Sequence, residues 1–534
     1  MKLQKSAIAA ALALSLLPCC AASAASPASN SAVTTAVTYT GTEIQFSDSG
    51  ITSAASDGVE IAGTALTIKK SGTYLLSGTC ADGSIKVKNG TTGVTLVLNG
   101  LTLTSKTTAP IICAKSTEVS IVAAANTENT LTDTENNNAD DGGAEAENAV
   151  IKCKDGSTVT LCGTGTLNVI ANGKNGIKSG ASTESEGDAS LTIRELTLNI
   201  AAPVNDAVNA EAALNVESGT LTIAAGDDAL HCDNAMNIGA ESTAGPSITI
   251  TTCCEGLEGA AVNVYSGNVT IKSTDDCINA ANPSLSGYSD TLNISGGTIV
   301  AYTTSGDGFD SNGDITISGG TVAVWTANAA DNSPLDADGT VTISGGTVLA
   351  AGGSGGMGMN LSAQQPCVTF GSTGGMMGGK GSGMGGQRQP PDMQNFDGQN
   401  IEKPDTQNMP GQDFGGFGSA ASLMAENTAF SILDAQGNTL YSGTARCGVS
   451  FLLFSSSELS EGNSCTLSVD GTDTTADVQT GTISSGMGFP GGSRHGNGNF
   501  GNGNFPGGMG GQRPDWNFDS NGNGGKSTEN AQAK

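Results

Sequence analysis

The sequence predicts an all-β protein built as a right-handed parallel β-helix, with a small C-terminal β element and low-complexity insertions. Three observations support this: 77 glycines among 534 residues, only 14% charged and 4% aromatic residues, and short strand-like segments that repeat along the chain. Ordinary globular domains contain roughly 7% glycine and about 25% charged residues. This composition excludes a helix bundle or a coiled coil.

The first 24 residues have the layout of a secretory signal peptide. Lys2 and Lys5 precede an apolar run from Ala7 to Leu17, and the small residues Ala-Ser-Ala follow at 22–24. The run is shorter than the roughly 18 to 20 residues that a membrane span needs, and no later run is longer. We therefore expect a secreted, extracellular protein with no integral membrane segment in the mature chain, and a linker at 25–39.

Attachment to the cell surface stays open. Cys19 and Cys20 stand where a bacterial lipoprotein carries its acylated cysteine, but Pro18 occupies a position where a small residue is expected. Lipid attachment is therefore the less favoured alternative.

The chain is strongly acidic, with 22 basic and 51 acidic residues and a net charge of -29. A polyanion gains nothing by approaching phosphates. The charge therefore excludes nucleic acid and anionic membranes as partners and favours cations.

Internal repeats over residues 40–370 predict the β-helix. Strand-like segments follow glycine turns, and their spacing varies from 23 to 48 residues; the longest interval divides in two if SITI (Ser247 to Ile250) marks another coil. These segments are SGTLTI (from Ser218), SGNVTI (from Ser266), SGGTIVAY (from Ser295), SGGTVAVW (from Ser318) and SGGTVLAA (from Ser344). Each has a second alternating strand upstream, such as LNV (Leu214 to Val216). Two or three short strands per repeat of about 20 to 30 residues suit a parallel β-helix.

The remaining segments differ in composition. Residues 371–422 are rich in Gly, Met, Gln and Pro, and residues 483–534 are rich in Gly and Asn, so both are predicted to be disordered. Strand-like sequence returns at 423–482, which we expect to form a C-terminal β element that closes the last coil.

Eleven cysteines lie beyond residue 24. No CxxC pair occurs, which argues against zinc. Disulfides are one interpretation, but several of these cysteines replace Ala, Gly or Val of neighbouring repeats. We therefore favour small buried hydrophobic residues.

Superposed repeats align acidic residues in two columns. One column lies two residues before an inward apolar residue of each repeat, and the other lies one residue after it. Stacked coils place such equivalents about 4.8 Å apart, where carboxylates repel one another or recruit cations. Oxygen ligands suit calcium, although acids at turns also serve as simple turn formers. The candidate calcium ligands are Asp227, Asp228, Asp233, Glu255, Glu258, Asp275, Asp276, Asp307, Asp310 and Asp336.

Lys272, Tyr302 and Trp325 occupy one further column, on the outward face of the downstream strand. Aromatic faces stack on sugar rings, and a lysine can pair with a uronate carboxylate. The sequence therefore predicts an exposed carbohydrate-binding stripe. The alternative is that Tyr302 and Trp325 pack beneath a loop.

Several long motifs resemble one family. They are GDDALHCDNAMNI (from Gly226), CEGLEGAAVNVYSGNVTIKSTDDCINAA (from Cys254), GDGFDSNGDITISGGTVAV (from Gly306) and PLDADGTVTISGGTVLAAG (from Pro334). The chain is similar in these motifs to the secreted, calcium-binding β-helix proteins known as carbohydrate-binding domain-containing proteins. The resemblance implies binding of cellulose or polygalacturonate on a fold similar to that of calcium-dependent pectate lyases.

Three functions follow from these observations. The favoured one is a monomeric, non-catalytic protein that binds plant cell-wall polysaccharide with calcium. The second is a pectate-type lyase, which needs a basic residue beside the calcium. Lys272 is the only base that we expect beside the acidic column. The third is a cell-surface scaffold or adhesin, in which calcium gives only rigidity.

Overall fold

The computed structural model describes residues 39–54, 57–282, 285, 290–327, 332–353, 360–371 and 422–484. The predicted signal peptide, nearly all of the linker, the 371–422 insertion except its two ends, and the tail from residue 485 onward lie outside these residues. Within them, the protein contains strands and no helix, and most strands join one large, mostly parallel sheet. Accordingly, no described segment is a helix that could span a bilayer.

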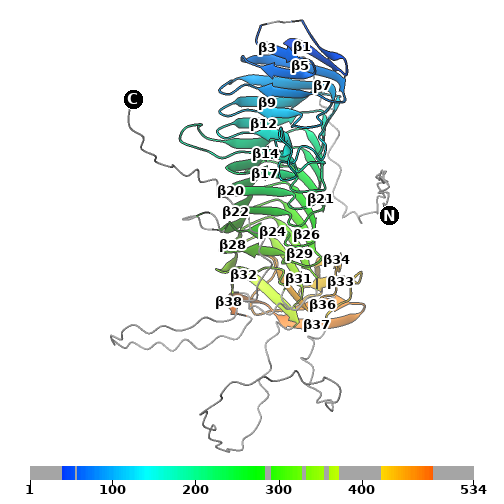
Figure 1. The fold of residues 1–534 in the computed structure, drawn as a ribbon. Helices are drawn as coiled ribbons and strands as arrows, with labels where there is room; N and C mark the ends of the chain where they lie inside the picture. Colours follow the sequence, from blue (N-terminus) through cyan, green and yellow to red (C-terminus); the bar gives the residue numbers. More distant parts are fainter. Residues whose placement is uncertain are drawn as a thin grey trace, which may run out of the picture. The chain divides into compact units, whose positions relative to one another are not determined.

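The parallel pairing joins each strand to its equivalent in the next coil, so the coils form three ladders (Figure 1). The first ladder contains β4 (Ala65–Ile68), β6 (Ser84–Val87), β8 (Ile111–Cys113), β11 (Ala149–Cys153), β14 (Asn175–Ser179), β17 (Val208–Ala210), the starts of β20 (Leu230–Ile238) and β22 (Leu257–Val264), β24 (Ile278–Ala280) and β27 (Phe309–Ser311). The second contains β1 (Thr42–Ser47), β5 (Gly72–Cys80), β7 (Val94–Thr104), β9 (Glu118–Ala123), β12 (Thr158–Gly163), β15 (Ser190–Ile193), β18 (Ala213–Val216), the ends of β20 and β22, β25 (Thr291–Ile294), β28 (Asp314–Ile317), β30 (Val341–Ile343) and β32 (Asn360–Gly371). The third contains β10 (Glu128–Thr132), β13 (Thr166–Ile170), β16 (Thr197–Ala202), β19 (Thr220–Ala225), β21 (Ser247–Thr252), β23 (Asn268–Ser273), β26 (Thr298–Thr303), β29 (Thr321–Thr326) and β31 (Thr347–Gly352).

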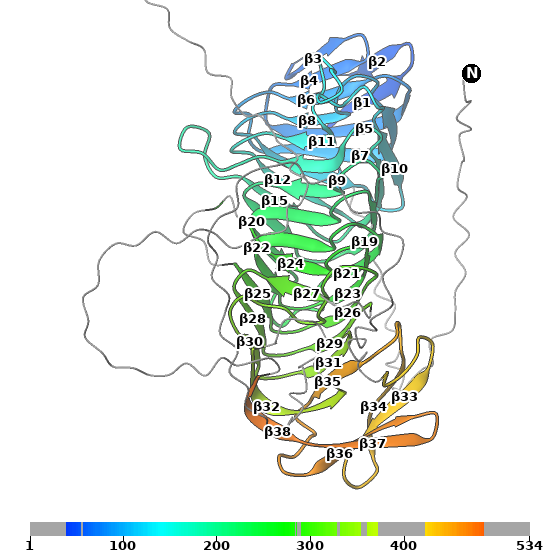
Figure 2. The ribbon, with the colours of Figure 1, turned by 60° about the horizontal axis from the view of Figure 1, so that its bottom comes forward.

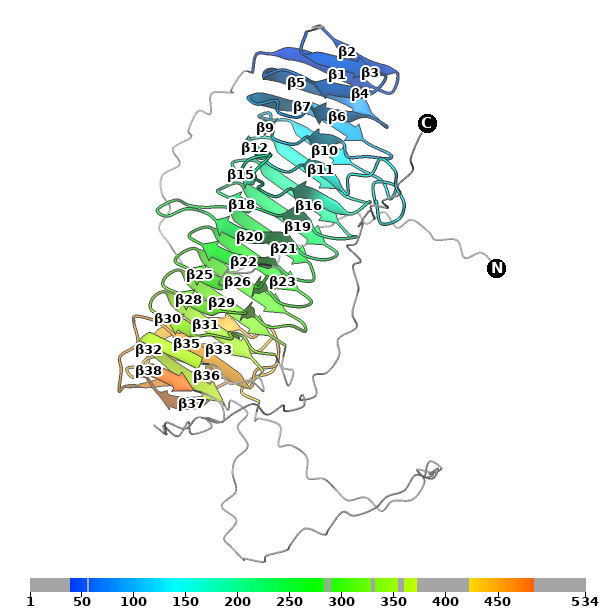
Figure 3. The same cartoon turned by 60° about the vertical axis from the view of Figure 1, so that its left-hand side comes forward.

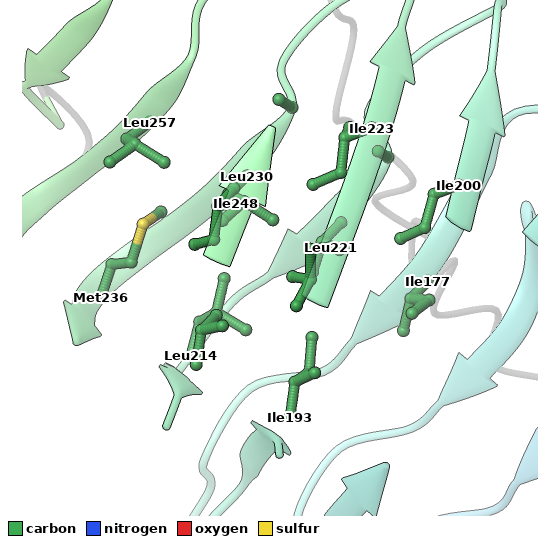
Figure 4. Packing of buried hydrophobic residues seen from close by; sticks show 14 of the residues in the cluster. Ile177, Ile193, Ile200, Leu214, Leu221, Ile223, Leu230, Met236, Ile248 and Leu257 are labelled. Atoms are coloured by element: carbon green, nitrogen blue, oxygen red, sulfur yellow. The ribbon is translucent and has the colours of Figure 1, made fainter. Parts of the chain in front are cut away.

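The alternating sequences produce these ladders because every second side chain points inward. Leu214 pairs with Met236, and Met236 pairs with Val262, so that equivalent apolar residues stack through the interior. Figure 4 shows Leu214, Leu221, Leu230 and Met236 among the buried side chains between the strands. The all-β class and the parallel pairing of repeats are thus confirmed, and SITI forms part of β21, a further coil.

Glycine at the turn before the third ladder is required by close approach between coils. Gly297, Gly320 and Gly346 have φ values of 82°, 83° and 83°. A Cβ atom on Gly320 would lie 2.7 Å from the carbonyl oxygen of Gly297. The repeated Ser-Gly-Gly-Thr turns therefore permit the coils to stack in register.

Asparagines also join the coils along the outward face of the second ladder. The side-chain amide of Asn237 donates to Asn215 at 2.9 Å, and those of Asn263 and Asn293 each donate to the preceding asparagine at 3.1 Å. These bonds link four successive coils by the polar residue at the centre of motifs such as LNV and VNV.

Two antiparallel elements stand at the ends of the coils. At the N-terminal end, β2 (Gly50–Ser53) pairs with β1, and β3 (Val59–Ala62) pairs with β4. At the C-terminal end, β35 (Phe451–Ser455) pairs with both β31 and β32, and β38 (Gln479–Ser484) pairs with β32 (Figure 2). A separate sheet contains β33 (Ala429–Leu433), β34 (Thr439–Thr444), β36 (Ser464–Val469) and β37 (Thr472–Asp477) (Figure 3).

All eleven cysteines in the described part of the chain are free. Nine are buried and two, Cys162 and Cys254, are half-buried. This agrees with their interpretation as small core residues rather than as a disulfide framework.

Candidate functional site

The acidic residues predicted from the repeats lie at the turns that lead into the first ladder. Backbone hydrogen bonds stack these turns directly: the amide of Ala207 donates to the carbonyl of Asp228 at 2.9 Å, and that of Ala229 donates to the carbonyl of Glu255 at 2.9 Å. Gly256 bonds Asp276 in the same way at 3.1 Å. We call the carboxylates at these turns and strand starts the acidic ladder, which comprises Asp206, Asp227, Asp228, Asp233, Glu255, Glu258, Asp275, Asp276, Asp307, Asp310 and Asp336.

The second predicted column also has the expected register. His231 pairs with Glu258, Glu258 pairs with Asn279, and Asn279 pairs with Asp310. A bridge between Phe309 and Leu335 places Asp336 beside this column.

Three clusters gather ligand atoms within 4.8 Å of one another. They are Asp206 with Asp227 and Asp228, Asp228 with His231 and Glu258, and Asp307 with Asp310 and Asp336. The structure therefore brings together seven of the ten predicted ligands. One of them, Asp233, joins through its contact with His231. The other six belong to the clusters: Asp227, Asp228, Glu258, Asp307, Asp310 and Asp336. Asp275 and Asp276 lie in the intervening coil before β24, and Glu255 precedes Glu258 in the coil of β22.

Burial and mutual repulsion raise the pKa values of many of these carboxyl groups. Burial is the largest cause throughout, and neighbouring carboxylates add to it. The pKa is raised to about 6 for Asp206 and Asp228, to about 7 for Asp276 and Asp307, and to about 9 for Glu255. Such a ladder of partly desolvated acids requires protons or cations to balance its charge.

His231 supplies one cation from the protein itself. Its Nδ1 contacts Glu258 and lies 3.4 Å from Asp228, and its Nε2 lies 2.9 Å from Asp233. Burial opposes the charged imidazole, but these three carboxylates outweigh it and raise the pKa of His231 strongly. The imidazolium therefore occupies the centre of the Asp228 and Glu258 cluster, and lowers the pKa of Glu258.

The Asp307, Asp310 and Asp336 cluster has no such histidine. Asp307 accepts a hydrogen bond from the Ser333 amide, and Asp276 accepts one from the Asp307 amide at 2.6 Å. In the neighbouring coil, the Asn279 side-chain nitrogen donates to Glu255 at 3.0 Å, while its buried Oδ1 has no hydrogen-bond partner within the described residues. An unpartnered acceptor beside ionised carboxylates fits a bound cation, because an ionised carboxylate offers it no donor.

Sequence reasoning missed Asp206. It stands two residues before Val208, as Asp228 stands before Leu230, and Val208 pairs with Leu230. Extending the column one repeat toward the N-terminus would have found it.

The Lys272, Tyr302 and Trp325 column exists, but the prediction that the whole stripe is exposed is wrong. The register is as expected, since Lys272 pairs with Tyr302 and Tyr302 pairs with Trp325. Trp325, however, is only 2% exposed. Its ring lies edge-on to Phe430 of β33, with 5.9 Å between the ring centroids. The C-terminal sheet, rather than a loop, therefore covers it.

A cleft of about 1180 Å³ remains between the third ladder and this sheet. Three residues line it from the third ladder: Lys272 of β23, Tyr302 of β26 and Trp325 of β29. Of these, Tyr302 is half-buried. Phe430 and Tyr441 line it from the opposite side, and their rings stack with centroids 5.8 Å apart. Exposed Arg446 also lines the cleft, and neither it nor Lys272 forms an ion pair within the described residues.

The expectation that Lys272 alone stands beside the acidic column is also wrong. Lys272 lies on the third ladder, whereas Lys178 of β14 pairs with Asn209, which pairs with His231. Repeats N-terminal to Gly226 resemble the others less closely, so this lysine was not aligned with them.

Comparison with known proteins gives matches of different extent. The family model for the carbohydrate-binding domain-containing protein matches residues 62–356. A protein of the same description from Acetivibrio thermocellus is 37% identical over 122 residues, which are 23% of this chain and 42% of that protein. The chain therefore matches less than half the length of this curated relative.

A solved structure described as the polysaccharide lyase-like protein from C. thermocellum, a gadolinium derivative, is 23% identical. It covers 58% of this chain and 94% of its own, with a TM-score of 0.31. The family match itself extends over more than half of the sequence and includes the coils that carry the acidic ladder and the β23, β26 and β29 side of the cleft. The chain belongs to the carbohydrate-binding domain-containing protein family.

Proposed function

We propose that the protein is a non-catalytic polysaccharide-binding protein that takes a glycan into the cleft between the third ladder and the C-terminal sheet. The cleft itself carries this proposal. It combines aromatic rings with Lys272 and Arg446, two cations that form no ion pair within the described residues, in a cavity of about 1180 Å³. Rings supply apolar faces for sugars, and ammonium and guanidinium groups pair with carboxylates.

The two cations outnumber Asp470, the acid that also lines the cleft, and so favour an acidic polymer such as polygalacturonate over neutral cellulose. Tyr302 and Tyr441 are both half-buried, so part of each side chain remains accessible. Trp325 stabilises the wall of the cleft through Phe430 and does not offer an exposed shelf.

Calcium is the proposed cofactor of the acidic ladder. The donors are carboxylate and amide oxygens, which are the ligands that calcium prefers, and the unpartnered Asn279 Oδ1 fits this chemistry. Asp307, Asp310 and Asp336 would hold the ion at one end of the ladder. When bound, calcium would supply positive charge between coils whose carboxylates otherwise repel one another.

The remaining features of this proposal follow from the sequence. The coils wind as a right-handed β-helix, and the mature protein acts outside the cell as a monomer, either released or attached to the cell surface. The apolar N-terminal run supports the extracellular location.

Incubation of the purified protein with polygalacturonate tests the proposal. Binding is followed by pull-down, and cleavage is followed by the ultraviolet absorbance of unsaturated uronate, each with and without calcium. We expect saturable binding and no growth of absorbance. Growth of absorbance would replace the binder with a lyase, and a lack of both signals would favour a scaffold or adhesin.

A further inference from the structure

The outward column of the first ladder changes its charge along the coils. In the C-terminal coils this column carries Glu258 and Asp310, which belong to the acidic ladder. In the N-terminal coils it carries lysines: Lys152 of β11 pairs directly with Lys178 of β14. Asn209 and the imidazolium of His231 separate Lys178 from Glu258, so the sign changes between the coils of β20 and β22.

Acidic residues of these coils form ion pairs with three nearby lysines. Lys154 bonds Glu147 at 2.7 Å, Lys174 pairs with Asp140, and Lys178 lies 3.6 Å from Glu211. Within the described residues Lys152 forms no ion pair, although its side chain is half-buried. The result is a desolvated ammonium group with a second ammonium group in the next coil.

Glu211 offsets part of the repulsion between Lys152 and Lys178, but it pairs with Lys178 and leaves Lys152 without an ion-pair partner within the described residues. Residues directly opposed on neighbouring strands lie about 5 Å apart, and like charges there repel. Burial lowers the pKa of Lys152, and the charge of Lys178 lowers it further, while Glu211 and Glu147 act in the opposite direction. A carboxylate placed between the two ammonium groups would offset both the repulsion and the lost hydration.

We propose that Lys152 and Lys178 form a second glycan contact that binds a carboxylate group of an acidic polysaccharide. This inference rests on the proposed function, but the site is separate from the cleft, because it lies on the first ladder rather than the third. Two ammonium groups can each donate to one oxygen of the same carboxylate. The site therefore selects uronate-containing polymers and ignores neutral ones.

Binding measurements on charge-neutral variants of the full chain test this site. The double variant Lys152→Gln, Lys178→Gln is compared with Lys88→Gln, which removes an exposed lysine that forms no ion pair within the described residues. We expect the double variant to bind polygalacturonate about tenfold more weakly than the wild type, since charged hydrogen bonds contribute roughly this much. Lys88→Gln and the conservative Lys152→Arg should bind as the wild type does.

Two further polymers make the outcome specific. Binding of cello-oligosaccharides should not change in the double variant, whereas dextran sulfate should bind it more weakly than the wild type, because ammonium groups also donate to sulfate oxygens. Equal polygalacturonate affinities for the double variant and Lys88→Gln would overturn the inference while leaving the proposed function intact. If the wild type binds no glycan at all, the proposed function itself fails. Weaker binding of dextran sulfate by the double variant with no loss of polygalacturonate affinity would contradict recognition of carboxylates.

The ammonium groups themselves provide an independent readout. The side-chain carbon shifts of Lys152, followed by NMR as a function of pH, should show its pKa rising when short oligogalacturonates are added. An unchanged titration in the presence of saturating ligand would contradict direct contact, even if the double variant were poorly folded.

Discussion

The same kind of sequence pattern predicts the acidic ladder and the aromatic side of the cleft: one residue type recurs at one position of the repeat. Both patterns have the register that their spacing predicts. The acidic turns stack on the turns of neighbouring coils, whereas Trp325 is covered by Phe430, more than 100 residues later in the chain. The comparison teaches that periodicity predicts which residues stack on one another, but not which distant segment covers them.

The two regions are also stabilised by different interactions. The acidic ladder gathers like charges, so its stability depends on His231, protons and the proposed cations. The cleft gathers apolar rings from two sheets, and its stability comes from packing. Substitutions and solution conditions should therefore separate the two regions.

Trp325→Ala should have the largest effect, because it leaves a cavity beneath the C-terminal sheet. Truncation of a buried aromatic residue costs about 3 to 5 kcal/mol, which urea unfolding measures. Trp516→Phe is the control, since it changes the other tryptophan of the chain. A loss below about 1 kcal/mol would mean that Trp325 is exposed after all, as the sequence alone suggested.

Calcium should affect the acidic ladder next most strongly. At a concentration 100-fold above its dissociation constant, a ligand specific for the native state adds about 2.7 kcal/mol. Chelation should therefore lower the melting temperature, and Asp307→Asn should reduce this response. Asp473→Asn, which changes an exposed acid of β37, should retain the full response. An unchanged melting temperature on chelation would contradict the binding of calcium by the acidic ladder.

In the presence of chelator, the free energy of unfolding should fall as the pH rises from about 4.5 to 7.5. Asp276 and Asp307 have native pKa values of about 7, raised from 3.8, so the native state binds more protons than the unfolded state across this window. Glu258 acts in the opposite sense, but its pKa is lowered from 4.5, which places its contribution below the window.

The fall should be at least about 1.4 kcal/mol, which corresponds to one unit of pKa shift. Denaturant unfolding at a series of pH values measures it. Saturating calcium should diminish the fall, because the ion binds the deprotonated carboxylates. A rise in stability over the same range without calcium would contradict the repulsion inferred for the acidic ladder.

Tyr302→Ala should have the smallest free-energy effect and should act on binding. Loss of one aromatic contact costs about 1 kcal/mol, or roughly five-fold in affinity for polygalacturonate. Tyr265→Ala, which changes a half-buried tyrosine outside the cleft, is the matched control. Equal affinities for the two variants would place the glycan elsewhere.

Much of the fold was predictable because each coil repeats the same physical requirements. Alternating apolar residues, Ser-Gly-Gly-Thr turns and acids at fixed offsets predict strands, close stacking and a carboxylate column. The columns extend to Asp206 and Lys178, but they were not found there because the N-terminal repeats lack the long shared motifs. The cleft could not be predicted, because Phe430, Tyr441 and Arg446 belong to no repeat.

Trp325 also provides the most direct test of glycan binding in the cleft. In a Trp516→Phe variant it is the only tryptophan, since the chain contains two. Titration with oligogalacturonates should change its fluorescence saturably, with a midpoint that matches pull-down, and Tyr302→Ala should weaken both signals together. Tight binding by pull-down with no change in Trp325 fluorescence, and no effect of Tyr302→Ala, would contradict the assignment of the cleft as the glycan site.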